Sequence, residues 1–418
     1  MAVAMEANGA ACAHGSGAAA IVSGVLLWIL LSPAQAQTFN VIHDFSGGGD
    51  GARPFAGLIM DRAGSLYGTA SFGGSGPCFS GCGNVFRLKR AGSSWVLSVL
   101  YSFQGGPNDG AEPLAGVTIA ADGRLYGTTG GGGNPACNSG CGTVFQLRPP
   151  VRACTSIQCP WTETVLYRFN GNDGGNPAYG SLVFDQSGSL YGTTQNGGAH
   201  GYGVVYKLTP SGGGWTESSI YDFTGGNDGA FPVSGLMVDQ TGELYGTTAY
   251  GGTLNRGVVY KLTPSGAGWV QSVLSNFENG GQNPIGGLIL DANGNLFGTT
   301  YLGGAFGSGT VFQLQPTNDG WTQITLHDFT GDGGPAGALA MDPSGNLSGG
   351  SETTGGRGAL FRLTPSNGGW NYSELHDFNG SDGEFPFGNV IVDTHGNIFG
   401  TCSIGGGTGN GVVWEITP

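Results

Sequence analysis

The chain has 418 residues, of which 86 are glycine and only 10% are charged. With 28 acidic against 14 basic residues, its formal net charge of −14 argues against nucleic acids and anionic membrane surfaces as partners. Because a Gly-X-Y period is absent and aromatic residues make up 11% of the chain, its composition excludes a collagen-like or disordered protein.

The first 36 residues have the features of a signal peptide. Residues 18–31 are largely apolar, Pro33 follows them, and Ala34-Gln35-Ala36 places small residues at a cleavage site. This apolar stretch is short for a membrane span, so we expect a mature chain that begins at Gln37, spans no membrane and is secreted, periplasmic or attached to the cell surface. Since no Lys or Arg precedes the stretch, an uncleaved anchor or a later start site are the alternatives.

From about residue 39 to the end, the chain consists of repeats marked by the motif Leu-Tyr-Gly-Thr. The motif begins at residues 66, 125, 190 and 244, recurs as Leu-Phe-Gly-Thr at 296 and Ile-Phe-Gly-Thr at 398, and has a decayed copy at 347. A period of about 50 residues is typical of radial or stacked repeat proteins. We therefore predict one domain, residues 37–418, that contains seven repeats.

One unit, residues 232–277, indicates how each repeat folds. It has four short apolar runs, at 236–238, 244–247, 258–262 and 269–277, with a hairpin turn at 239–242 and a Thr-Pro-Ser-Gly turn before the last run. No window has useful helical periodicity. Each unit is predicted to form four antiparallel strands, and seven such units predict an all-β, seven-bladed β-propeller.

The two ends of the repeat region complement each other. The last unit stops after its third strand, at residues 412–416, whereas residues 38–45 end in His43-Asp44-Phe45 and match the fourth-strand ends at 327–329 and 376–378. We therefore predict that the N-terminal strand pairs with residues 411–416, completes the last blade and closes the ring.

Seven cysteines follow the predicted signal peptide. Three close pairs are present, Cys78 with Cys82, Cys137 with Cys141, and Cys154 with Cys159. In an exported chain such pairs predict three local disulfides, and zinc held by paired thiolates is the alternative. Cys402 is left over and is expected to be a buried thiol. We expect no metal and no other cofactor.

Two series of acidic residues recur with the repeat. The first stands in Asp-Gly pairs between units, at Asp50, Asp109, Asp173, Asp228, Asp332 and Asp382, and Gln282-Asn283 replaces the pair in the remaining unit. The second stands five residues before the motif, at Asp61, Asp185, Asp239, Asp291, Asp342 and Asp393. An Asp caps a turn through its own backbone, so we interpret both series as structural, with a cation- or sugar-binding ring of Asp-Gly carboxylates as the alternative for the first.

The recurring segments also resemble a known family. Leu-Tyr-Gly-Thr-Thr at 244–248, Gly251-Gly252 and Gly-Val-Val-Tyr-Lys-Leu-Thr-Pro at 257–264 are similar to the GloVer (Gloeo/Verruco) tandem repeat of exported bacterial proteins. The resemblance covers residues 39–418 and implies a secreted protein of β-propeller type. A weaker likeness is to kelch repeats, but Tyr206 and Trp215 stand nine residues apart, wider than the kelch pattern.

Any ligand is expected at the loops that gather on one face of a propeller, between the second and third strands and between successive units. The residues that break the repeat in these loops are the candidate binding residues, together with the charged Arg53 and Glu112. They are Phe72, His200, Tyr202, Phe231, Tyr250, Arg256, Arg357 and Phe385.

We predict a monomeric binding scaffold for extracellular glycan or protein ligands. The first alternative is a carbohydrate-active hydrolase or lyase that uses Glu352 and Glu384 as an acid/base pair. The second alternative is a structural protein of the envelope or matrix. The sequence contains no nucleophile elbow, zinc-protease motif, phosphate loop or dinucleotide fingerprint, so we assign no catalytic residue outside the first alternative.

Overall fold

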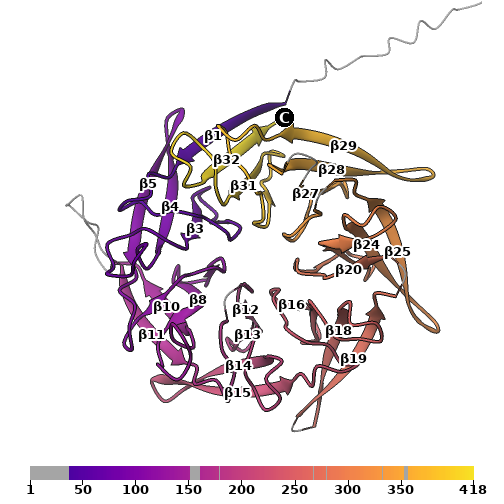
Figure 1. Ribbon diagram of the computed structural model, residues 1–418, viewed down its shortest axis with the longest axis horizontal. Helices are drawn as coiled ribbons and strands as arrows, with labels where there is room; N and C mark the ends of the chain where they lie inside the picture. Colours follow the sequence, from indigo (N-terminus) through magenta and orange to yellow (C-terminus); the bar gives the residue numbers. More distant parts are fainter. Residues whose placement is uncertain are drawn as a thin grey trace, which may run out of the picture. The chain divides into compact units, whose positions relative to one another are not determined.

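The structure is a computed structural model that describes residues 37–150, 161–177, 179–266, 268–278, 280–331, 333–352 and 356–418. Gln37–Pro418 form one compact unit, a ring of seven blades around a central opening (Figure 1). The predicted signal peptide, Cys154, Cys159 and Asp332 lie outside the described residues. Within them every element is a β-strand or turn, and no helix is present.

Each blade is a four-stranded antiparallel sheet whose strands follow one another from the centre of the ring outward. Blade 1 contains β2 (Ile59–Met60), β3 (Leu66–Ala70), β4 (Asn84–Ala91) and β5 (Ser94–Ser102). Blade 2 contains β7 (Thr118–Ile119), β8 (Leu125–Thr129), β10 (Thr143–Arg148) and β11 (Thr162–Arg168). Blade 3 contains β12 (Val183–Phe184), β13 (Leu190–Thr194), β14 (Val204–Ser211) and β15 (Gly214–Asp222). Blade 4 contains β16 (Met237–Val238), β17 (Leu244–Thr248), β18 (Val258–Ser265) and β19 (Gly268–Asn276).

The remaining three blades follow the same order. Blade 5 contains β21 (Ile289–Leu290), β22 (Leu296–Thr300), β24 (Thr310–Thr317) and β25 (Gly320–Asp328). Blade 6 contains β26 (Ala340–Met341), β27 (Leu347–Ser351), β28 (Ala359–Ser366) and β29 (Gly369–Asp377). Blade 7 contains β30 (Ile391–Val392), β31 (Ile398–Cys402), β32 (Val412–Thr417) and β1 (Thr38–Asp44). Two short pairs, β6 (Gly110–Ala111) with β9 (Gly131–Gly132) and β20 (Gly281–Gln282) with β23 (Leu302–Gly303), link the loops.

The N-terminal strand completes the last blade, as predicted. β1 runs antiparallel to β32, with Phe39 opposite Ile416 and Val41 opposite Trp414. Just beyond β1, Phe45 is fully buried and packs with Phe86 of blade 1. The first segment of the repeat region therefore belongs to blade 7 and also contacts blade 1.

The glycine of the recurring motif is required by the aromatic ring of the neighbouring third strand. In blade 4, Gly246 lies opposite Tyr260, and a Cβ atom added to Gly246 would lie 2.5 Å from the Tyr260 hydroxyl oxygen. Equivalent close approaches occur at the motif glycine of every blade, against Phe, Tyr or Trp. The motif thus records a packing constraint, since only glycine leaves room for the ring.

The threonine that follows this glycine joins neighbouring blades. Thr247 Oγ1 donates to the carbonyl of Gly286 at 3.3 Å, and Thr401 Oγ1 donates to that of Ala56 at 2.9 Å. These carbonyls belong to the segment that enters the next blade, so each bond crosses a blade boundary. The Thr401 bond joins blade 7 to blade 1 and so closes the ring near its centre.

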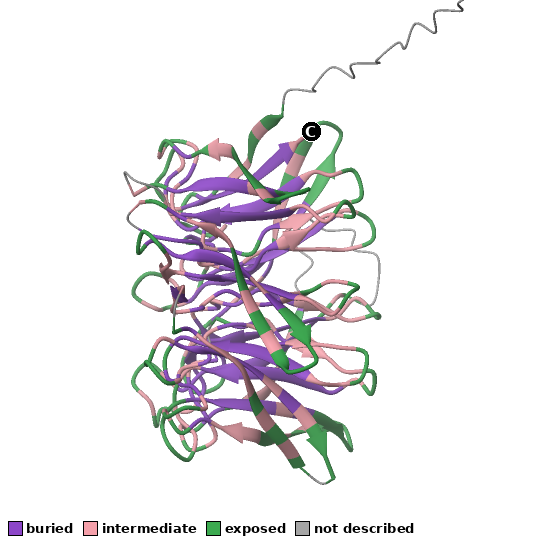
Figure 2. Ribbon diagram, turned by 90° about the vertical axis from the view of Figure 1, so that its right-hand side faces the viewer, coloured by how far each residue is buried: buried purple, intermediate pink, exposed green. Residues whose placement is uncertain are grey.

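A β-bulge recurs in each outer strand and turns an apolar side chain inward. In blade 4, Val259 pairs with Ser275 but Tyr260 pairs with Val273, so Leu274 is the extra residue, and it packs against the core between blades 4 and 5. A bulge adds local twist and redirects one side chain. Figure 2 shows the result as buried strands inside the ring and exposed hairpins at its rim.

The third strand is longer than expected. Thr263-Pro264-Ser265, interpreted from sequence as part of a turn, continue β18 and pair with β19, with Pro264 opposite Trp269. The pairing of β18 with β17 ends at Leu262. Beyond that point β18 has only one neighbour, and an edge position tolerates a proline because no second ladder needs its missing N–H.

Candidate functional site

The carboxylates of the Asp-Gly pairs serve the fold, as the structural interpretation predicted. Asp228 Oδ2 accepts hydrogen bonds from Tyr221 Oη at 3.0 Å and from the backbone N–H of Thr224 at 2.8 Å. The same arrangement joins Asp50 to His43, Asp109 to Tyr101, Asp173 to Tyr167 and Asp382 to His376. Each carboxylate holds the ring at the end of a fourth strand and the turn that follows, so it is already committed to partners within the chain.

One sequence alignment in this series was wrong. Gly280-Gly281, and not Gln282-Asn283, stand where other units have Asp-Gly, because Gln282 pairs with Leu302 as Ala230 pairs with Tyr250. Asn283 then precedes Pro284 as Phe231 precedes Pro232. The misalignment arose because the connection before Pro284 is shorter than most of its counterparts, and sequence spacing alone does not locate the missing residues.

The second acidic series caps the first hairpin of the six blades that contain it. Asp239 Oδ1 accepts from the backbone N–H of Thr241 at 2.9 Å and of Glu243 at 3.0 Å. Its Oδ2 accepts from Tyr245 Oη at 3.4 Å. In blades 1, 3 and 4 the tyrosine of the motif bonds to this acid, whereas in blades 5, 6 and 7 the side-chain amide of an Asn donates to the carboxylate instead.

Six residues on the loop face have an unusual backbone conformation. We define the loop face as the one that carries the loops between second and third strands and the connections between blades. Each of the six directly precedes a proline and has φ between 53° and 57°, the left-handed region that favours glycine. They are Arg53, Glu112, Asn176, Phe231, Asn283 and Phe385.

Backbone hydrogen bonds hold this conformation from both sides. The N–H of Phe231 donates to the carbonyl of Tyr202 in blade 3 at 2.9 Å, and its own carbonyl accepts from Ala249 in blade 4 at 3.1 Å. The other five residues have the equivalent pair of bonds. A non-glycine residue costs about 1–2 kcal/mol in this region, and strained positions of this kind cluster at ligand clamps and active sites. The residue before each proline is therefore a candidate ligand contact.

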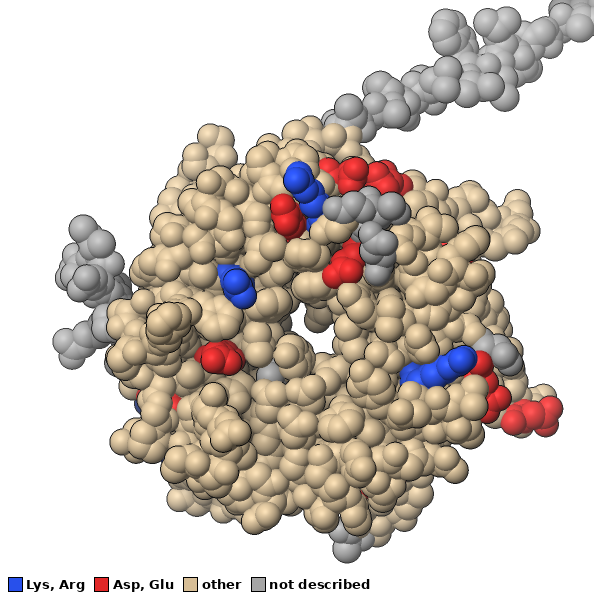
Figure 3. All heavy atoms as spheres, in the orientation of Figure 1, with Lys and Arg blue, Asp and Glu red and all other residues tan. Residues whose placement is uncertain are grey.

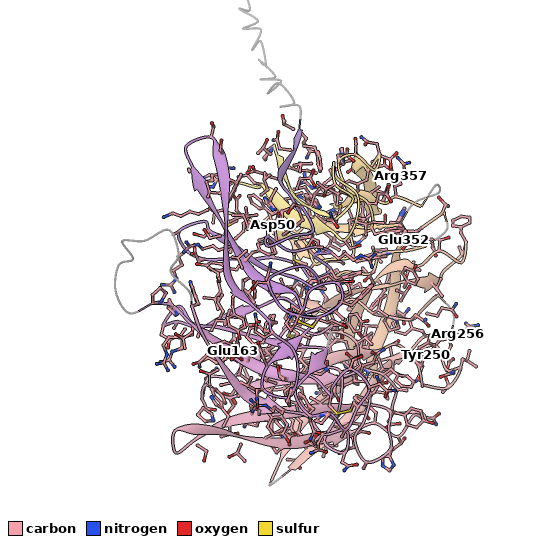
Figure 4. All side chains as sticks on the ribbon, turned by 60° about the vertical axis from the view of Figure 1, so that its left-hand side comes forward. Asp50, Glu163, Tyr250, Arg256, Glu352 and Arg357 are labelled. Carbon is pink, nitrogen blue, oxygen red and sulfur yellow. A yellow bond between two sulfur atoms is a disulfide. The ribbon has the colours of Figure 1, made fainter. Side chains whose placement is uncertain are left out.

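These bonds assemble the sequence-predicted residues into groups of three at the blade junctions. Each group has three members. The first lies in the loop between the second and third strands of one blade, the second is the strained residue, and the third lies just after the second strand of the next blade. The groups are Asn410, Arg53 and Phe72; Cys82, Glu112 and Gly131; Cys141, Asn176 and Asn196; Tyr202, Phe231 and Tyr250; Arg256, Asn283 and Leu302; and Arg357, Phe385 and Ile404. Seven of the eight candidate binding residues belong to these groups. Figure 4 shows Tyr250, Arg256, Glu352 and Arg357 along the same face of the ring.

At the junction of blades 3 and 4, the three residues of the group are all aromatic. The rings of Tyr202 and Phe231 are 5.6 Å apart at 68°, and those of Phe231 and Tyr250 are 6.0 Å apart at 90°. They border a pocket of about 450 Å³ that is also lined by Asn227 and Asn255. Tyr202 and Tyr250 remain 39% and 43% exposed, so part of each side chain is available to a ligand.

Glycines shape this aromatic pocket. A Cβ atom on Gly225 would lie 2.6 Å from the Tyr202 ring, which therefore lies directly on the backbone of the turn. The carboxylate of Asp228, next to the lining residue Asn227, accepts hydrogen bonds from Tyr221 and Thr224. The pocket thus offers aromatic faces and amide groups, without a pair of converging acids among its lining residues.

Two other junctions combine an aromatic ring with arginine. The guanidinium of Arg53 lies 5.5 Å from the centre of the Phe72 ring, a cation–π contact. At the junction of blades 6 and 7, Arg357 Nε lies 3.7 Å from Glu384 Oε1, and Phe385 stacks on Phe387 with ring centres 5.5 Å apart. Figure 3, which presents the loop face, shows its charged side chains in a few small groups on a mostly uncharged surface.

The remaining candidates have separate positions. Arg256 Nη1 donates to the carbonyl of Glu278 at 2.8 Å. His200 is exposed near the tip of the loop between β13 and β14 and belongs to none of the groups. For the proposed acid/base pair, Tyr301 Oη donates to Glu352 Oε2 at 3.0 Å, whereas Glu384 faces Arg357. The two carboxylates thus contact different partners.

Sequence analysis missed two partly buried acids, Glu163 and Glu217. Burial raises the pKa of Glu163 to about 7, with a further contribution from the charge of Asp109. Burial also raises the pKa of Glu217 to about 7, with a further contribution from Asp173. In each of them Oε1 is buried and has no hydrogen-bond partner among the described residues. A buried oxygen of this kind does not reach a substrate, so we assign the two glutamates no role in binding or catalysis.

The cysteines follow the disulfide prediction where they are described. Cys78–Cys82 and Cys137–Cys141 form disulfides, and Cys402 is a free, buried thiol whose pKa is raised, mainly by burial. The Cys154–Cys159 pair stays a prediction. In the described part of the chain, no group of three His, Cys, Asp or Glu side chains is placed to hold a metal ion. The described residues also contain no helix that is long and apolar enough to cross a membrane.

Comparison with solved structures gives distant likenesses at the level of the fold. The extracellular domain of a putative hybrid two-component system from B. thetaiotaomicron has a TM-score of 0.55 and 14% identity, with 91% of this chain and 41% of that chain covered. This chain therefore spans less than half the length of that protein. A protein from Lactobacillus plantarum has a TM-score of 0.54 and 14% identity, with 84% of this chain and 91% of that chain covered.

No curated protein matches this chain in sequence. The model of the Gloeobacter/Verrucomicrobia repeat matches residues 24–159, 155–349 and 270–418. Together these ranges include all seven blades and every copy of the Leu-Tyr-Gly-Thr motif. The chain belongs to the Gloeobacter/Verrucomicrobia repeat family.

Proposed function

We propose that this propeller is an extracellular binding protein and that it binds a glycan at the aromatic pocket between blades 3 and 4. The observation that carries the proposal is the group of Tyr202, Phe231 and Tyr250, held around a pocket of about 450 Å³ by a strained backbone. Pockets of about 300–1,000 Å³ suit small ligands.

The chemistry of the pocket favours a sugar over a charged ligand. Sugar rings present C–H faces that pack on aromatic rings and hydroxyl groups that bond to amides. Tyr202 and Tyr250 supply exposed rings, while Asn227 and Asn255 supply amides at the same pocket. No Lys, Arg, Asp or Glu is among its lining residues, so we propose a neutral glycan. The two disulfides are typical of exported proteins and support an extracellular location.

The enzyme alternative has no comparable observation in its favour. A glycosidase needs two carboxyl groups about 5–10 Å apart that face a common substrate. Glu352 contacts Tyr301 and Glu384 contacts Arg357. The aromatic pocket has no carboxylate in its lining. Binding without turnover is therefore the function that we propose.

The test is to screen the mature protein, residues 37–418, against a glycan panel and to analyse the products. We expect binding without cleavage, and a loss of at least tenfold in affinity for Tyr250→Ala and for Tyr202→Ala, which corresponds to about 1.4 kcal/mol. Phe306→Ala is the matched control, since Phe306 is 66% exposed on the equivalent loop of blade 5. Unchanged binding in both tyrosine variants contradicts the proposed site, and released sugar products contradict the proposed function.

A further inference from the structure

Between blades 4 and 5, two side chains are missing: the Tyr or His near the end of the fourth strand and the Asp that bonds to it. The other described junctions contain one or both of them. At the end of the fourth strand, the residue opposite Val259 is Ser275, whereas the equivalent position elsewhere holds Tyr or His. The carboxylate that bonds to such a ring is missing as well, because Gly280 stands where Asp228 stands in the preceding connection. Blade 4 has therefore lost both members of the pair.

The loss leaves a polar hollow of about 400 Å³. It is lined by Ser275, Asn276, Glu278, Trp321, Gln323 and Thr325, over the buried side of Leu274. A Cβ atom on Gly280 would lie 3.5 Å from Gln323 Nε2 and 3.7 Å from Thr325 Oγ1, at ordinary van der Waals distance, so the backbone of Gly280 lies beside two residues that line the hollow. The hollow thus occupies the place that a ring and its acid fill elsewhere.

The hydrogen-bonding groups of the hollow are partly used and partly available. Ser275 Oγ donates to Gln323 Oε1 at 2.7 Å, which fixes the amide and directs Nε2 away from Ser275. Glu278 Oε1 accepts from Thr253 Oγ1 at 2.9 Å, and Asn276 Oδ1 accepts from the backbone N–H of Thr253 at 3.2 Å. Among the described residues, the amide nitrogens of Gln323 and Asn276 have no acceptor, so they are donors for a ligand.

We infer that this hollow is a second ligand site, and that it takes one neutral pyranose ring. It combines amide donors, carboxylate and hydroxyl acceptors and the side of Trp321. Sugar hydroxyls both donate and accept, so they satisfy such a mixed set. No Lys or Arg lines the hollow to attract an anion, and one carboxylate is too few ligands for a bound calcium ion.

The two sites share one loop but differ in their residues. Gly252 and Asn255 line the aromatic pocket, while Thr253 between them bonds to Asn276 and Glu278 of the hollow. The inference therefore does not depend on the proposed function of the aromatic pocket, and it is tested in a protein whose aromatic pocket has been removed.

The experiment uses the mature protein with Tyr202→Ala and Tyr250→Ala as the background. Methyl β-glucoside, methyl α-mannoside and methyl β-galactoside are titrated at millimolar concentration, and the indole N–H signal of Trp321, assigned with Trp321→Phe, is followed by NMR. We expect this signal to shift to saturation with at least one glycoside. Ser275→Tyr, which restores the residue of other blades, should weaken this binding at least tenfold, and Ser272→Tyr on the exposed side of the same strand should not.

The possible results separate cleanly. The inference is overturned if no glycoside moves the Trp321 signal, or if Ser275→Tyr leaves the titration unchanged. If Ser275→Tyr does not fold, Gln323→Leu replaces it, because this change removes the amide donor and the acceptor of Ser275 without adding bulk at the strand end. Failure of the proposed function has a different signature, namely unchanged glycan binding by Tyr250→Ala in the parent protein.

Discussion

Glu163 and Glu217 are held in the fold at an energetic cost, and we expect their replacement by glutamine to stabilise the protein. Burial, together with the charge of Asp109 or Asp173, raises the pKa of each from 4.5 to about 7. Above pH 4.5 the unfolded chain releases these protons before the folded protein does. Stability is therefore lost as the pH rises from 4.5 to about 7, and the whole penalty remains at higher pH.

The size of the effect follows from this shift. The full shift corresponds to about 3 kcal/mol per carboxyl group, but both side chains are partly exposed and water screens them, so we expect about 1 kcal/mol per substitution at pH 8. Near pH 4 the two glutamates are protonated in both states, and the substitutions should then be close to neutral. Glutamine fits the site, since Gln271 has the same register position in blade 4 and donates to the carbonyl of Asp228 at 3.2 Å.

The assay is urea unfolding of the parent and of each variant at both pH values. The quantity compared is the difference in unfolding free energy between variant and parent. This comparison is needed because burial lowers the pKa of His43 and His327, so these histidines increase stability as the pH rises, in the parent and the variants alike. Glu374→Gln, an exposed acid on the fourth strand of blade 6, is the control. The reasoning is refuted if Glu163→Gln and Glu217→Gln destabilise the protein at pH 8, or if they stabilise it equally at both pH values.

Three further predictions concern the blades. Tyr206→Phe and Tyr260→Phe should each raise stability by about 1 kcal/mol in thermal unfolding, because their buried hydroxyls have no partner among the described residues and other blades have Phe at this position; lower melting temperatures would contradict this. Gly246→Ala should destabilise the protein by more than about 2 kcal/mol, since its Cβ would lie 2.5 Å from the Tyr260 hydroxyl. Gly268→Ala, with no atom within 4 Å of the new Cβ, should be close to neutral, and equal effects of the two alanines would refute the packing explanation of the motif. Deletion of residues 37–45 should expose the edge of β32 and cause aggregation in size-exclusion chromatography, whereas a monomer of unchanged melting temperature would show that β1 is dispensable.

Sequence predicted the blades well because each motif residue has one packing role that recurs in several units. In the Leu-Tyr-Gly-Thr segment, Leu packs in the core, Tyr bonds to the hairpin, Gly leaves room for an aromatic ring and Thr bonds to the next blade. All four interactions are with neighbouring groups. The closing strand was also predictable, because the ending of β1 resembles the ends of other fourth strands.

The candidate sites were only partly predictable. Breaks in the repeat identified Tyr202, Phe231 and Tyr250 one at a time, but their meeting depends on which loop follows which blade around the ring. The recurring residue before proline was visible in the sequence, although its left-handed backbone was not. The hollow arises because Ser275 is small and the connection that follows it is short. In the sequence it is marked only by a missing ring and a missing Asp, and the alignment of Gln282-Asn283 with the Asp-Gly pair hid the missing Asp.

The strained residues before the prolines give this scaffold a simple route to new specificities. Their backbones are fixed by bonds to both adjacent blades, whereas their side chains range from Arg and Glu to Asn and Phe. The bonds that hold these six positions are made by backbone groups and are therefore open to different side chains. A library that varies only these residues and their partners in the second loops would sample many recognition surfaces on one constant frame, much as antibody loops do on theirs.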